Sequence, residues 1–192
     1  MGRKQAANYE TRRAVIVDQA ARLFATSGFL GASIADIGRA CGASKSLIYH
    51  YYPSKEDILF EVMDSHLLQL TGAVETVASS AASPERKLKD LTHRFMGAYI
   101  GAADRHRVLL NELGNLPAAR RIMIVARQRA LIEAVERLIA EVRPDLATPR
   151  TRRALTMLFF GMINWTHTWF RPEGAVGAEE LADLASGLVL GR

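Results

Sequence analysis

Residues 33–56 read SIADIGRACGASKSLIYHYYPSKE, and this stretch decides how the chain begins to fold. Ser33 is followed three residues later by Asp36, the pattern of a serine that caps a helix and an acid that returns the hydrogen bond. A Cys-Gly-Ala turn ends that helix. Ser44 then caps a second helix, which must finish before Pro53 because proline disfavours helical geometry in the residue before it. The stretch predicts a helix-turn-helix.

The second short helix concentrates side chains that hydrogen-bond to bases and phosphates. They are Lys45, Ser46, Tyr49, His50 and Tyr51. Ile34, Ile37 and Ile48 supply the apolar side that holds the unit together. Such a helix is narrow enough to lie in the DNA major groove. Glycine-bearing helix turns are also common in purely structural helix pairs, so the geometry alone leaves both interpretations open.

The regions on either side of this stretch also have helical patterns. Apolar residues recur at three- and four-residue spacing from about Glu10 to Ser27, where Gly28 stops a first helix, and Lys55 lies at the start of a fourth. Later breaks, rich in Gly, Pro or Ser, fall near 79–84, 101–104, 114–117, 144–149 and 172–177. No strand-like alternation is sustained. The chain is therefore expected to be all-α with about nine helices.

The charge of the 192-residue chain is concentrated at one end. Residues 1–55 hold eight Lys or Arg against three Asp or Glu, which accounts for the whole formal net charge of +5. This segregation is typical of a segment that meets a polyanion, and the alternative is a solvated basic face. We expect a DNA-binding domain over 1–55 and a separate domain over 56–192.

Residues 23–29, LFATSGF, and the stretch 33–56 closely resemble the N-terminal domain of the TetR family of bacterial transcriptional regulators, with matching spacing throughout. Two positions depart from the family pattern: Tyr51 stands where His is frequent, and Tyr52 where Phe is usual. The resemblance implies an all-α fold, with a three-helix helix-turn-helix domain followed by a larger helical domain for ligand binding and dimerisation. It implies a regulator, most commonly a repressor, and no enzymatic activity.

The family pattern and the chemistry of the side chains together predict the DNA-binding residues. They are Ser33, Ser44, Lys45, Ser46, Leu47, Tyr49, His50, Tyr51 and Lys55. The second short helix is the recognition helix of this pattern, and the residues at its start face base edges. There Lys45 can donate to guanine and Leu47 can touch a thymine methyl group. A basic arm is expected to add salt-sensitive affinity, the alternative being a tail without DNA contacts. Its residues are Arg3, Lys4, Arg12 and Arg13.

The resemblance also implies a homodimer that places two recognition helices about 34 to 36 Å apart on a pseudo-palindromic double-stranded operator. Two C-terminal helices, over 149–170 and 178–190, are expected to form the dimer surface as an intermolecular four-helix bundle. The apolar residues that favour this surface are Leu155, Leu158, Phe159, Met162, Trp165, Leu181, Leu184 and Leu188.

A ligand pocket in the second domain is implied by the same resemblance. Its expected lining is Met63, Leu67, Phe95, Tyr99, Leu110, Met123, Arg127, Trp165 and His167, each of which has an ordinary core role as its alternative. Residues 165–174, WTHTWFRPEG, are similar to a sub-group of TetR-type repressors of fatty-acid, aromatic-acid or steroid breakdown, several of which respond to acyl-CoA thioesters. An acyl-CoA ligand needs cations for its phosphates, and four arginines on one expected helix offer them: Arg120, Arg121, Arg127 and Arg129. The alternative is that these arginines form a solvated helix face.

Other classes of protein receive little support. The sequence has no phosphate loop, no metalloprotease motif and no metal-binding spacing among its five histidines, so neither a metal nor a cofactor is expected. A small all-α enzyme and a helical ligand-binding protein without a DNA role remain as alternatives. The uncharged run 154–170 is too short and too polar for a membrane span. The single cysteine, Cys41, and the lack of a signal peptide favour the cytoplasm.

Overall fold

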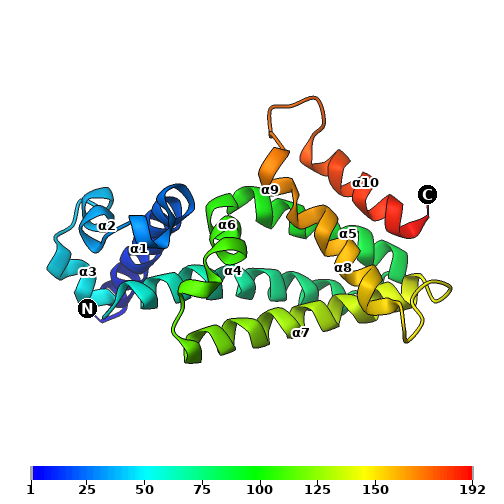
Figure 1. The fold of residues 1–192 in the computed structure, drawn as a ribbon, viewed down its shortest axis with the longest axis horizontal. Helices are drawn as coiled ribbons and strands as arrows, with labels where there is room; N and C mark the ends of the chain where they lie inside the picture. The colour runs from blue at the N-terminus through cyan, green and yellow to red at the C-terminus, as the bar shows by residue number, and fades with distance from the viewer. Residues whose placement is uncertain (1, 192) are drawn as a thin grey trace. The chain divides into compact units, whose positions relative to one another are not determined.

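The computed structural model describes the backbone of residues 2–191 and the side chains of residues 8–191. Every regular element in that range is a helix, which confirms the all-α class (Figure 1). The α-helices are α1 Gly2–Gly31, α2 Ile34–Ala40, α3 Lys45–Tyr51, α4 Lys55–Ala78, α5 Pro84–Gly101, α6 Ala103–Asn111, α7 Ala118–Val142, α8 Arg152–Asn164, α9 Thr166–Trp169 and α10 Ala178–Leu190. A short 3-10 turn, Leu113–Asn115, lies between α6 and α7.

The described residues group into two compact units. Unit 1 contains the chain up to His66 together with Asp104–Ile124, and unit 2 contains Leu67–Ala103 and the chain from Val125 onward. Helices α4 and α7 each contribute residues to both units. These units are defined by packing. The boundary expected at residue 55, between a DNA-binding domain and a ligand-binding domain, is a division by function and stays a prediction.

The first three helices of unit 1 follow the capping and glycine pattern of the sequence. Gly28 has φ 72° and ψ 160°, outside helical values, so it kinks α1 near its end as expected for a glycine stop. Ser33 and Asp36 form the predicted capping box at the start of α2. Helix α3 ends at Tyr51, before Pro53. The core beneath these helices includes Phe24, Ile37 and Ile48, each at most 1% exposed.

Helix α6 joins unit 1 through polar contacts that the sequence did not reveal. Arg105 Nη2 pairs with Asp18 Oδ1 of α1 at 2.6 Å, and Arg105 Nη1 donates to Ser65 Oγ of α4 at 2.9 Å. The next residue, His106, is buried, and its Nδ1 lies 3.2 Å from Nε2 of the equally buried His66. Arg105 and His106 therefore connect α6 to consecutive residues of α4.

Unit 2 is built around aromatic packing between α5 and the C-terminal helices. Helix α5 packs against α10 and α8 (Figure 1). Phe95 stacks on Phe160 with 6.2 Å between ring centroids, and Phe159 packs edge-on against Phe160 at 5.6 Å. The helix expected over 149–170 is interrupted at Trp165, which separates α8 from the single turn of α9. None of the described helices is long and apolar enough to cross a membrane.

Candidate DNA-binding surface and ligand cavity

The recognition helix α3 is set by the turn before it. Gly42 takes φ 61°, a left-handed conformation that suits glycine, and the amide of Ala43 donates to the carbonyl of Gly38 at 2.8 Å. A Cβ at Gly38 would lie only 2.8 Å from the Ala43 carbonyl oxygen. Ser44 Oγ then accepts from the amide of Leu47 at 3.1 Å, which caps α3. The angle between α2 and α3 therefore depends on glycine at these two positions.

Helix α3 presents a polar face to solvent and one anchor to the core. Ile48 is fully buried, and Leu47 and Tyr51 are half-buried. The remaining side chains are exposed: Ser44, Lys45, Ser46, Tyr49 and His50. Lys45 Nζ lies 5.7 Å from the centroid of the Tyr49 ring, so the two side chains share one surface. Hydrogen-bond donors and acceptors at successive positions of a solvent-exposed helix suit contacts with base edges and phosphates.

Two of the cations expected on this surface, Lys55 and Arg13, make contacts within the subunit instead. Lys55 Nζ donates to the carbonyls of Phe29 and Ala32 at 2.7 and 2.9 Å and lies 4.1 Å from the Phe29 ring centroid, so its charge stabilises the end of α1. Arg13 is paired within the subunit, as described below. Arg12 is exposed. The side chains of Arg3 and Lys4 lie outside the described residues.

Ser33 is the expected DNA contact with the most internal hydrogen bonds. Its hydroxyl donates to Asp36 Oδ2 at 2.6 Å and accepts from the amide of Asp36 at 3.2 Å, while its own amide donates to Oδ2 at 2.8 Å. These hydrogen bonds hold the pKa of Asp36 below its ordinary value. Ser33 remains exposed at the α2 N-terminus, where a phosphate oxygen can still approach.

The structure does not gather the nine expected ligand-binding residues into one cavity. Four are buried in the core: Met63, Leu67, Phe95 and Tyr99. Burial raises the pKa of the Tyr99 hydroxyl. Leu110, Arg127 and His167 are half-buried, and His167 Nδ1 donates to the carbonyl of Asn164 at 2.7 Å. Met123 and Trp165 are 46% and 65% exposed. Arg120, expected to offer a cation to the ligand phosphates, pairs with Asp57 Oδ1 at 2.6 Å.

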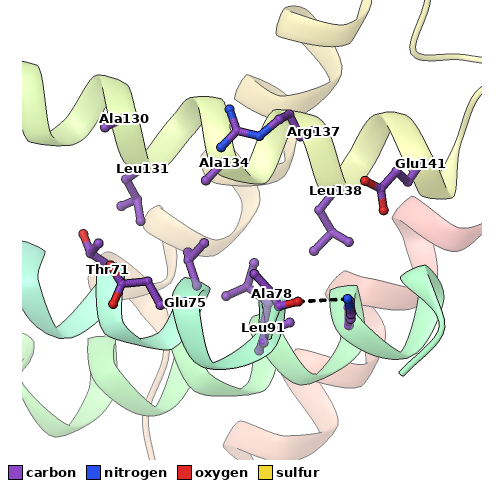
Figure 2. A pocket seen from close by; sticks show the side chains of 13 residues that line it. Thr71, Glu75, Ala78, Leu91, Ala130, Leu131, Ala134, Arg137, Leu138 and Glu141 are labelled. Carbon is purple, nitrogen blue, oxygen red and sulfur yellow. Dashed lines mark hydrogen bonds between the residues drawn. The ribbon is translucent and has the colours of Figure 1, made fainter. Parts of the chain in front are cut away.

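A cavity of about 440 Å³ lies instead within unit 2, between α4, α5 and α7. Its lining is Thr71, Val74, Glu75, Val77, Ala78, Lys87, Leu91, Ala130, Leu131, Ala134, Arg137, Leu138 and Glu141. Figure 2 shows Leu131 and Leu138 pointing from α7 toward α4, with Ala134 between them. Its volume falls in the range of small-molecule sites. Sequence reasoning missed these residues because alanines and leucines on a helix face resemble ordinary core.

The charges on this cavity are mixed. Glu75, Arg137 and Glu141 are exposed on its lining, and Lys87 Nζ donates to the carbonyl of Ala78 at 3.1 Å (Figure 2). The wall between them is aliphatic. Such a site favours a molecule with an apolar part to bury and a polar part that stays near solvent.

Helices α8 and α10 leave large apolar side chains on the surface. Leu158, Trp165 and Leu188 are each 65 to 68% exposed. Met157, Met162 and Leu184 are 36 to 55% exposed. Phe159, expected on the same surface, is completely buried within the subunit. Several exposed apolar residues of this size on helices that pack together are typical of protein interfaces.

Comparison with known proteins gives matches over both halves of the chain. Residues 16–62 match the description "Bacterial regulatory proteins, tetR family", and residues 81–192 match "Tetracyclin repressor-like, C-terminal domain". The repressor KstR2 of Mycolicibacterium smegmatis is 26% identical over 192 residues, which cover 94% of this chain and 90% of the relative.

Two solved structures have the same fold over nearly the whole chain. A TetR-family transcriptional regulator from Bordetella parapertussis is 38% identical, with 93% of each chain covered and a TM-score of 0.88. AibR, in a crystal structure with isovaleryl coenzyme A and operator DNA, is 26% identical, with coverage of 92% and 97% and a TM-score of 0.81. These relatives are regulators and not enzymes, and the second family match spans more than half of the chain. The chain therefore belongs to the TetR family and is a DNA-binding transcriptional regulator.

Proposed function

We propose that the protein is a homodimeric repressor that reads a pseudo-palindromic operator with α3 and leaves it when a small apolar or acyl-CoA-type ligand binds. Regulators of the TetR family bind operator DNA and dimerise. In this proposal residues 1–55 contact DNA, and residues 56–192 hold the ligand and the partner subunit. The observation that carries the proposal is the exposed polar face of α3, anchored by the buried Ile48.

The dimer is proposed to form through α8 and α10. Leu158 and Leu188 are exposed on these helices, and a second copy of the same surface would remove them from water. At about 25 cal/mol per Å² of apolar surface, burial of several such side chains provides the main driving force for association.

The ligand is proposed to place its apolar part in the cavity between α4, α5 and α7. A short acyl chain fits the aliphatic wall, and Arg137 offers a cation to a phosphate or carboxylate at the edge of the cavity. The isovaleryl coenzyme A in the AibR structure supports a thioester of this kind. Helix α4 begins at Lys55, which holds the end of α1, and carries cavity residues such as Thr71 later in its length.

The operator part is tested by selecting duplexes from a randomised pool and footprinting the intergenic DNA beside the gene. We expect a protected pseudo-palindrome, with affinity that falls steeply as salt rises. Lys45→Ala and Tyr49→Ala should weaken this binding while the subunits stay dimeric. Equal operator affinity in both variants would remove the role of α3.

The ligand part is tested by release of the bound operator on addition of isovaleryl-CoA, octanoyl-CoA, the free acids or coenzyme A alone. Ala134→Phe fills the cavity and should abolish release while operator affinity is retained. Ala126→Phe is the matched control, because Ala126 lies on the same helix but is exposed and outside the cavity. No release by any thioester would refute the acyl-CoA class.

A further inference from the structure

The last turn of the recognition helix is held from the side by α1. The rings of Tyr9 in α1 and Tyr51 in α3 lie 4.8 Å apart between centroids, with 34° between their planes. One turn later in α1, Arg13 Nε donates to the hydroxyl of Tyr52 at 3.2 Å, and the guanidinium lies 5.1 Å from the centroid of that ring. Tyr9 and Arg13 are four residues apart, so they project from the same face of α1.

Arg13 also joins this contact to α4. Its Nη2 pairs with Glu61 Oε2 at 2.8 Å. Tyr52 is 3% exposed. A phenylalanine at this position would fill nearly the same space but could not form the hydrogen bond with Arg13. Replacing Tyr52 with phenylalanine would therefore remove this hydrogen bond while Arg13 keeps its ion pair with Glu61. Arg13 therefore connects the end of α3 to α4 through a specific bond as well as through packing.

Helix α3 needs such contacts because it buries little of its own surface. It is seven residues long, and Ile48 is its only buried residue. The turn fixes the N-terminal end of α3, but one buried side chain near the middle leaves the other end able to tilt, and base contacts require side chains placed to within a fraction of an ångström. Contacts with Tyr51 and Tyr52 at its C-terminal end supply the second attachment that determines the tilt.

We propose that Tyr9 and Arg13 are positioning residues that orient the recognition helix through Tyr51 and Tyr52 and so determine how well the protein distinguishes its operator from other DNA. This inference rests on the proposed role of α3 in reading the operator. It assigns Tyr9 a role through its ring, which packs at a tilt against the ring of Tyr51, and not through its hydroxyl. It assigns Tyr52 a role through its hydroxyl, which accepts from Arg13.

The experiment compares the full-length wild-type protein with Tyr9→Ala, Tyr9→Phe and Tyr52→Phe. Fluorescence anisotropy measures the affinity for a duplex selected by the wild-type protein and for a scrambled duplex of the same length, at several salt concentrations. We expect Tyr9→Ala and Tyr52→Phe to weaken binding to the selected duplex by about tenfold, the equivalent of about 1.4 kcal/mol. Binding to the scrambled duplex and the salt slope should not change, because the basic side chains are unaltered. Tyr9→Phe keeps the ring and should bind as the wild-type protein does.

Amide hydrogen exchange gives a second readout. Faster exchange confined to α3 in Tyr9→Ala and Tyr52→Phe supports the proposal, and unchanged exchange there overturns it. Tyr52→Phe is nearly isosteric, so it carries the test if Tyr9→Ala does not fold.

Other results would overturn the inference in distinguishable ways. An equal loss on both duplexes with an unchanged salt slope, seen also in Tyr9→Phe, would mean that the neutral Tyr9 hydroxyl contacts phosphate directly. Unchanged discrimination in Tyr9→Ala and Tyr52→Phe, while Lys45→Ala loses it, would remove the positioning role and leave the role of α3 intact. Failure of the wild-type protein to select any duplex would refute the reading role of α3 and this inference with it.

Discussion

Replacing Gly38 with alanine tests how tightly the helix-turn-helix is built. The new Cβ would lie 2.8 Å from the carbonyl oxygen of Ala43, which is shorter than real Cβ contacts. The turn cannot easily yield, because the amide of Ala43 is bonded to the carbonyl of Gly38 itself at 2.8 Å. Overpacking of this kind costs about 1 to 3 kcal/mol, and alanine returns about 1 kcal/mol of helix propensity. We expect Gly38→Ala to lower the free energy of unfolding by up to about 2 kcal/mol.

Urea unfolding followed by circular dichroism measures this change, with Gly72→Ala as the matched control. Gly72 also lies inside a helix, but a Cβ there meets nothing within 4 Å, so the control should be neutral or gain up to about 1 kcal/mol. Operator affinity of Gly38→Ala, measured where the variant is fully folded, should also fall because the turn sets the orientation of α3. A Gly38→Ala protein that is more stable than wild type, with unchanged operator affinity, would refute the reasoning.

Three further predictions address other parts of the molecule. Lys55→Met should lower the free energy of unfolding by about 2 to 4 kcal/mol because two charged hydrogen bonds are lost, whereas Lys45→Met should change it by less than about 0.5 kcal/mol in the same urea titration. The pKa of His66 is lowered to about 4 from the ordinary 6.5, mainly by burial and to a smaller extent by the positive charge of the nearby Arg105. The unfolded chain therefore takes up the proton first, and stability should fall by about 3 kcal/mol as the pH drops from 6.5 to 4, an effect that should be absent in His66→Gln. Leu158→Glu should convert the dimer to monomers in light scattering, while Leu146→Glu, at another exposed leucine outside α8 and α10, should remain dimeric.

Much of the DNA-binding half could be predicted from the sequence because its signals are local. Ser33, Ser44 and Gly28 act on backbone groups within a few residues, and the structure confirms the helix starts and the break that they predict. The fold class is confirmed for the same reason: the spacing of apolar residues and the punctuation by glycine and proline depend on neighbours in the chain.

The ligand cavity was not predictable, because it depends on contacts between residues far apart in sequence. Leu91 and Leu138 line it while Phe95 and Leu67 fill the core, and nothing in the residue types distinguishes these roles. Lys55 was expected beside DNA because it is a cation near the helix-turn-helix, yet two carbonyls at the end of α1 accept its hydrogen bonds. The contact between Tyr9 and Tyr51 joins positions 42 residues apart, and only the folded chain shows it.

The composition of unit 1 has a consequence for the order in which the chain folds during synthesis. Its first part ends at His66, but α6 and the first turns of α7, which complete it, are translated only after α5. A ribosome adds about 5 to 20 residues per second, so several seconds separate the emergence of His66 from that of its neighbour His106 and the rest of the unit up to Ile124. During that interval the nascent chain exposes the surface that α6 later covers. Slow codons placed far enough after Ile124 for that residue to have left the ribosome should therefore raise the yield of folded protein more than slow codons placed the same distance after Lys55, as measured by the soluble fraction.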